Sequence, residues 1–177
     1  MARSGAGIVI CPSTEGNLGD GLTDLHGWLA AGVPIAIGSD SHVTRNWPEE
    51  LRWLEYGQRL AKRQRNVAAA PSLGQATTAA RLFDAALAAG ANVAGQSIWG
   101  LVKGARADAL VLDPRFPALL GMPPSHSLEA LVFAGSEAGF SEVLVAGRIV
   151  LRNGRHDSAQ AIAERYSAVM DNLWALA

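Results

Sequence analysis

The chain has 177 residues, of which 49% are hydrophobic, and it carries 15 basic and 16 acidic side chains for a formal net charge of −1. This size and apolar content permit one packed core or two small ones, and the near-neutral charge argues against the basic surface that nucleic acids or anionic membranes require. Because no apolar stretch approaches a membrane span, no secretory signal opens the chain and Cys11 is the single cysteine, we expect a cytoplasmic protein.

The N-terminal residues predict alternating strands and helices. The apolar run over residues 7–11 predicts a buried strand, and the polar residues 13–21 predict a long irregular loop. A short helix over residues 23–31 then leads to a second apolar strand over residues 34–37. Strand, helix and strand in this order form a βαβ unit, which predicts a parallel sheet.

Two longer helices are predicted further along the chain. Asn46 and Glu49 fit a capping box at the start of the first helix, in which apolar residues recur at helical spacing through residues 47–61. The alanine-rich residues 75–89 predict the second helix, which is expected to end at Gly90. This part of the chain is therefore predicted to be mixed α/β.

Near residue 95 the pattern changes to short strand candidates separated by turn residues. These candidates cover residues 107–112, 128–133, 143–145 and 149–151. Ala146-Gly147-Arg148 predicts a tight hairpin turn between the last two of them, and Asn153-Gly154 predicts a second turn. The sequence therefore predicts a small β region distinct from the part before it.

Asp40 is the leading candidate for chemistry. It belongs to residues 38–42 (GSDSH), which directly follow the strand over residues 34–37, so its carboxylate lies at the carboxyl end of a predicted parallel strand. In α/β barrels that end is the catalytic face. The alternative role, capping the following turn, is common for aspartate. The position at the strand end favours the chemical role.

Four further polar residues are candidates, each with two open interpretations. His42 could assist catalysis or only stabilise the loop, and the sequence supports the two roles equally. Asn17 and Glu15 could face a polar substrate or make hydrogen bonds within their own loop. Arg45 could bind a substrate carboxylate or be solvated. The remaining histidines fit no zinc-binding spacing: His26, His126 and His156.

We expect three parts in the chain. Residues 1–94 supply the last βα units of a barrel, residues 95–156 a small β segment, and residues 157–177 a C-terminal helix. A complete eight-stranded barrel needs about 250 residues, and two parallel strands alone leave unpaired edges. We therefore expect the chain to be the C-terminal part of a larger protein.

Several segments resemble one known family. Residues 11–21 (CPSTEGNLGDG) resemble the signature that follows the seventh barrel strand of amidohydrolase-superfamily deaminases, and residues 38–42 resemble the metal signature after their eighth strand. Residues 104–108 (GARAD) resemble the turn that opens the small β-sandwich of this superfamily. Within the superfamily, residues 14–21 and 49–59 are most similar to the formimidoylglutamate deiminases.

The resemblance implies a fold and a reaction. The fold is α/β, the C-terminal part of a (β/α)8 metal-dependent hydrolase barrel plus a small accessory β-sandwich. The reaction is the zinc-dependent hydrolysis of N-formimidoyl-L-glutamate to N-formyl-L-glutamate and ammonia, a step of histidine degradation. Asp40 is then a zinc ligand and, with His42, a catalytic residue, while Asn17, Glu15 and Arg45 are candidates for binding the substrate.

The family's other metal ligands have no counterpart in this sequence. We therefore expect the isolated chain to be inactive and to hold no tight zinc site. For the complete protein we expect a small-molecule substrate, no nucleic-acid or membrane partner, and a homo-oligomer. Two alternatives remain open. One is another amidohydrolase deaminase, of the purine or aminohydrolase type, and the other is a non-catalytic fragment, either an orphan remnant or a piece that only associates with another chain.

Overall fold

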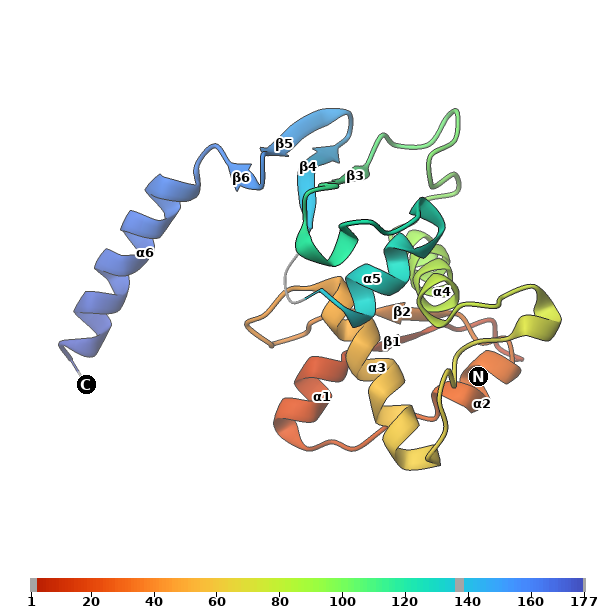
Figure 1. Cartoon of the computed structure of the whole chain (residues 1–177). Helices are drawn as coiled ribbons and strands as arrows, with labels where there is room; N and C mark the ends of the chain where they lie inside the picture. The colour runs from red at the N-terminus through yellow and green to blue at the C-terminus, as the bar shows by residue number, and fades with distance from the viewer. Residues whose placement is uncertain (1–2, 136–138, 177) are drawn as a thin grey trace. The chain divides into compact units, whose positions relative to one another are not determined.

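The computed structural model describes residues 3–135 and 139–176, which form two compact units (Figure 1). The first unit consists of residues 1–99 and 114–138, and the second of residues 100–113 and 139–177. The elements of the first unit are β1 Ile8–Ile10, α1 Pro12–Leu18, α2 Leu25–Ala30, β2 Ile35–Ile37, α3 Trp47–Lys62, η1 Pro71–Leu73, α4 Thr78–Val93, η2 Pro117–Leu119, η3 Pro124–His126 and α5 Ser127–Phe133. Those of the second unit are β3 Ala109–Leu112, β4 Phe140–Val145, β5 Arg148–Arg152, β6 Arg155–His156 and α6 Ala159–Trp174.

Strands β1 and β2 pair in parallel. Their register aligns Ile8 with Ile35 and Ile10 with Ile37. The connection between them contains α1 and α2, so the predicted βαβ order and parallel pairing are confirmed. Both strands therefore end at the same edge of this two-stranded sheet, and the segments that follow them begin there.

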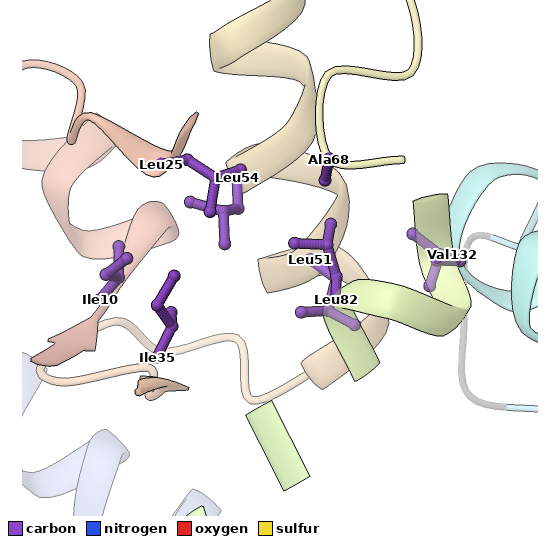
Figure 2. Close-up of a cluster of buried hydrophobic side chains, with 9 residues drawn as sticks. Ile10, Leu25, Ile35, Leu51, Leu54, Ala68, Leu82 and Val132 are labelled. Atoms are coloured by element: carbon purple, nitrogen blue, oxygen red, sulfur yellow. The ribbon is translucent and has the colours of Figure 1, made fainter. Parts of the chain in front are cut away.

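The core of the first unit lies between this sheet and helices α3, α4 and α5. Figure 2 shows Leu51 and Leu54 of α3 together with Leu82 of α4, and all three side chains are buried. The strands contribute Ile10 and Ile35 to the same cluster. Burying a leucine or isoleucine side chain stabilises a fold by about 1.5–3 kcal/mol, so this cluster is the main apolar contribution to holding α3 against the sheet.

Two charged side chains of α3 form hydrogen bonds with the backbone of neighbouring segments. Glu55, which is fully buried, accepts hydrogen bonds from the backbone N–H groups of Val67 and Ala68. Arg52 donates from its guanidinium group to the carbonyl oxygens of Val132 and Gly135 at the end of α5. These contacts satisfy backbone groups that the turn after α3 and the end of α5 would otherwise leave unpaired.

The structure corrects several predicted elements of the first unit. Residues 128–133 lie in the helix α5 and not in a strand, and residues 13–18 of the predicted irregular loop lie in α1. Helix α4 continues past Gly90 to Val93. Asn46 is the N-cap of α3, but its side chain makes no capping hydrogen bond, so the capping box is not formed.

The second unit contains a four-stranded antiparallel sheet in the order β3-β4-β5-β6. Ala146 and Gly147, with φ of +50° and +78°, form the two-residue turn between β4 and β5. Asn153 and Gly154 adopt the same left-handed conformation between β5 and β6. Both predicted turns are confirmed, since two positive φ angles define the turn type that two-residue hairpins favour.

The predicted β-sandwich is not confirmed, because within the described residues this unit has one sheet and not two packed sheets. The predicted C-terminal helix is present as α6, and almost all of its side chains are exposed. The division of the chain at residues 94 and 156 remains a prediction. No helix within the described residues is long and apolar enough to cross a membrane.

Candidate functional site

Asp40 lies in a tight turn just beyond β2, at the carboxyl end of that strand. The turn runs from Ser39 to His42, and the N–H of His42 donates to the carbonyl oxygen of Ser39 at 2.9 Å. Asp40 itself adopts φ +46°, a left-handed conformation that non-glycine residues enter only at an energetic cost. Its side chain is exposed, so the carboxylate is available to a ligand.

The start of α1 lies against this turn, because β1 ends at the same edge of the sheet as β2. The Thr14 hydroxyl group donates to the carbonyl oxygen of Ser39 at 2.7 Å and accepts from the N–H of His42 at 3.1 Å. Thr14 is 3% exposed. One buried hydroxyl group therefore contacts both ends of the turn that carries Asp40.

Glu50 of α3 holds the first turn of α1. Its carboxylate, 3% exposed, accepts a hydrogen bond from the Ser13 N–H at 3.0 Å and another from the Ser13 hydroxyl group. A buried carboxylate requires such donors to offset the loss of hydration. The sequence analysis missed Glu50 and Thr14. Glu50 did carry a signal, since it lies three residues after Trp47 and four before Leu54, on the apolar face of the helix.

Cys11 lies at the end of β1, beside this site. Burial raises the pKa of the Cys11 thiol above its ordinary value, and the negative charges of Asp40, Glu15 and Glu50 raise it further. A backbone hydrogen bond from Gly38 opposes part of this increase. The thiol is therefore neutral near pH 7, which is consistent with a packing role.

The predicted substrate-binding residues are distributed around the site. Glu15 accepts a hydrogen bond from the backbone N–H of Cys11 at 2.9 Å, so its carboxylate caps the start of α1. Asn17 is exposed on the last turn of α1, and Arg45 is exposed in the loop before α3. The imidazole Nδ1 of His42 accepts from the N–H of Thr44 at 3.1 Å, a contact that orders the loop.

Zinc coordination needs more ligands than these residues supply. Within residues 3–135 and 139–176, no group of three His, Cys, Asp or Glu side chains lies close enough together to hold a metal ion. Structural and catalytic zinc sites in proteins use three or four side-chain ligands. Asp40 can therefore contribute one oxygen ligand, but the described residues do not fit a zinc site on their own.

A cavity of about 480 Å³ lies in the first unit between α1 and α3. Its walls are mainly apolar and include Pro12, Leu22, Trp53 and Tyr56, together with Glu15. Asp40 is not among the residues that line it. The cavity and the Asp40 turn are therefore separate features of the first unit.

Comparison of the sequence with known proteins finds relatives among deiminases and deaminases. A formimidoylglutamate deiminase from Pseudomonas aeruginosa is 46% identical over 98% of this chain, which spans 38% of that protein. A 5-methylthioadenosine/S-adenosylhomocysteine deaminase from Desulforudis audaxviator is 30% identical over 88% of the chain, which spans 35% of it. The chain is thus little more than a third as long as these relatives.

The solved structures that resemble this chain include an amidohydrolase and a deaminase. An amidohydrolase from Brucella melitensis superposes with a TM-score of 0.88 at 38% identity, covering 98% of this chain and 38% of that one. An adenosine deaminase from Xanthomonas campestris with bound zinc has a TM-score of 0.76 at 22% identity, over 96% of this chain and 37% of its own, and shows the shared fold. The pattern of the amidohydrolase family matches residues 1–150. This chain belongs to the amidohydrolase family.

Proposed function

We propose that this chain is the C-terminal part of a zinc-dependent deiminase that hydrolyses N-formimidoyl-L-glutamate to N-formyl-L-glutamate and ammonia. In this proposal it contributes the last βα units of a (β/α)8 barrel. The whole protein is a cytoplasmic enzyme of histidine degradation with a small-molecule substrate, and it acts as a homo-oligomer. The carrying observation is the 46% identity to a formimidoylglutamate deiminase over 98% of the chain.

The geometry around Asp40 supports a catalytic role for this residue. Its carboxylate follows a parallel strand, is exposed, and sits in a turn whose two ends are hydrogen-bonded to Thr14. A carboxylate at this edge can accept a proton and return it to a leaving nitrogen. His42, two residues away, is the second catalytic candidate, and Asn17, Glu15 and Arg45 are the candidates for binding the substrate.

Zinc is the cofactor of the proposed enzyme and would supply an activated water at neutral pH. Support comes from the zinc-bound adenosine deaminase that shares the fold. In the whole protein Asp40 would be one ligand among several. Because the described residues supply no group of three ligands, we propose that this chain by itself has neither a tight zinc site nor activity.

A deaminase acting on a purine nucleoside is the second candidate, and the relative from Desulforudis audaxviator favours it. The two candidates differ in what the site must bind. Formimidoylglutamate carries two carboxylates, which need cationic partners, whereas a purine needs apolar and hydrogen-bonding surface. The higher identity to the deiminase favours the first candidate.

The test is ammonia release by the protein expressed from its gene at full natural length. We expect release from N-formimidoyl-L-glutamate and none from 5-methylthioadenosine. Asp40→Asn should lower kcat/KM by roughly 10³-fold, whereas the control Asp84→Asn, an exposed residue of α4, should leave it unchanged. Turnover of the purine nucleoside alone would establish the second candidate, and an inactive protein would refute both.

A further inference from the structure

We propose that Thr14 is a positioning residue for Asp40, because its hydroxyl group fixes both ends of the turn that presents the Asp40 carboxylate. The inference rests on the proposed function only in treating Asp40 as the reacting group. The contact itself joins residues 25 and 28 positions apart in the chain. Thr14 lies in the signature segment over residues 11–21, but the sequence pattern assigned no individual role to it.

The Thr14 hydroxyl group both donates and accepts a hydrogen bond at the turn. It donates to the Ser39 carbonyl oxygen at 2.7 Å and accepts from the His42 N–H at 3.1 Å. Ser39 and His42 are also bonded directly to each other at 2.9 Å. The three groups therefore form a closed ring of hydrogen bonds around the base of the turn, with Asp40 between the two anchored residues.

Such a ring matters here because Asp40 is held at φ +46°. A residue with a side chain stays in this conformation only where surrounding contacts determine it. Without the hydroxyl group, the single Ser39–His42 bond would remain, and the turn could relax toward other conformations. The direction of the carboxylate would then be less defined, although its exposure and charge would be unchanged.

The position of Thr14 is itself fixed through its own helix α1 and through α3. It lies in the first turn of α1, and its neighbour Ser13 is bonded through both N–H and hydroxyl group to the buried carboxylate of Glu50. Leu51, next to Glu50, is part of the buried core of the first unit. A chain of hydrogen bonds therefore connects Glu50 of the packed helix α3, through Ser13 and its neighbour Thr14, to the turn of Asp40.

The substitutions Thr14→Val and Thr14→Ser separate positioning from packing. Valine keeps the shape but removes both hydrogen bonds, whereas serine keeps the hydroxyl group and loses a methyl group. Because Ser39 and His42 still bond each other, valine leaves neither group buried without a partner, and the variant should fold. The matched control is Thr23→Val, which removes a hydroxyl group that accepts from the Trp28 indole N–H at 3.0 Å, away from the turn.

The first readout is amide hydrogen exchange at His42, measured by NMR on the full chain. We expect Thr14→Val to accelerate exchange at His42 by about 3- to 10-fold, with Ile37 of β2 unchanged. Thr14→Ser and Thr23→Val should match the wild-type rate at His42. Equal acceleration at His42 and Ile37, or none at His42, would overturn the proposal. If the valine variant does not fold, the serine variant decides, because faster exchange in it at His42 alone would equally contradict a hydroxyl-based role.

The second readout is the kinetics of the enzyme at natural length. Thr14→Val should lower kcat by at least about 10-fold with KM within twofold, and Thr14→Ser should restore kcat, because the hydroxyl group orients a catalytic group and does not bind substrate. A change in KM alone would contradict the proposal. If the enzyme releases no ammonia from N-formimidoyl-L-glutamate, the proposed function fails, and the exchange experiment still decides whether Thr14 fixes the turn.

Discussion

Glu55 is a charged residue buried for structural reasons. Its carboxylate accepts from the N–H groups of Val67 and Ala68 and from Arg59 at 2.8 Å. Glu55→Gln presents an amide N–H₂ group to these donors, so we expect the free energy of unfolding to fall by about 2–3 kcal/mol. Urea denaturation of the chain measures this loss.

The control for this prediction is Glu49→Gln, a partly exposed glutamate in the first turn of the same helix. Its loss should stay below about 1 kcal/mol, the range of a helix-dipole interaction. Equal losses for the two variants would mean that the hydrogen bonds of the Glu55 carboxylate do not stabilise the turn after α3.

Cys11 gives a prediction of pH dependence. Burial, together with the charges of Asp40, Glu15 and Glu50, raises the pKa of its thiol in the folded chain. Iodoacetamide reacts with the thiolate, so the midpoint of its pH–rate profile should lie higher for the folded chain than for the chain in urea. Since Cys11 is the single cysteine, labelling reports this site alone.

The same shift has a consequence for stability. The folded state binds the thiol proton more tightly than the unfolded state, so this contribution is complete below the unfolded-state pKa and is lost as pH rises through the folded-state pKa. Cys11→Ser should remove that part of the alkaline decrease in stability. A folded-state midpoint at or below that of the unfolded chain would contradict the prediction.

At the scale of elements, two glycines lie inside helices but differ in the space available for a side chain. A Cβ at Gly90 of α4 would meet no atom within 4 Å, whereas a Cβ at Gly57 of α3 would lie 2.7 Å from the Leu22 side chain. Gly90→Ala should therefore stabilise the chain by about 0.5–1 kcal/mol through helix propensity. Gly57→Ala should gain less or lose stability, because Leu22 must move.

Thermal unfolding of the two glycine variants checks this difference under identical conditions. Additional Leu22→Ala substitution provides the control, since it removes the side chain that the new methyl group would meet. In that background Gly57→Ala should recover the gain of Gly90→Ala. An unchanged deficit would show that Leu22 is not the obstacle.

The local sequence pattern correctly predicted the elements that are determined by a few neighbouring residues. The parallel pair of β1 and β2 and both two-residue turns of the second unit were predicted correctly. The apolar run over residues 128–133 was assigned to a strand because six residues are too few for periodicity to separate a buried helix from a buried strand. Its helical form follows from packing against α3 and α4, segments distant in sequence.

In the candidate site, too, the local sequence predicted some features, whereas others depend on contacts between distant residues. Asp40 could be located from the strand and glycine before it, but residues 13–18 of the irregular loop predicted after β1 belong to the helix α1, which begins with Pro12. The contacts of Thr14 and Glu50 join residues 25 to 37 positions apart, and no local pattern encodes them. Sequence therefore indicated which residue could react, and the structure showed what holds it.

At the scale of the whole molecule, each of the two units has apolar surface that the described residues of that unit leave exposed. Val9 of β1 is 56% exposed, and the apolar stripe of α6, from Ile162 to Leu173, is similarly open. The two strands β1 and β2 form a sheet of their own in the described part of the chain. A parallel sheet is normally buried on both faces, which is consistent with the chain spanning 38% of its deiminase relative.

In the proposed enzyme Asp40 is only one of several zinc ligands, which leads to a prediction for the isolated chain. Tight zinc binding needs several ligands acting together, and the described residues offer Asp40 without a group of three. After dialysis against zinc-free buffer the isolated chain should retain less than about 0.1 zinc ion per chain. The enzyme at natural length should retain about one, and Asp40→Asn should lower that occupancy. Stoichiometric zinc in the isolated chain, unchanged by Asp40→Asn, would mean that the chain holds a metal without Asp40 and would contradict the assignment of this residue as a ligand.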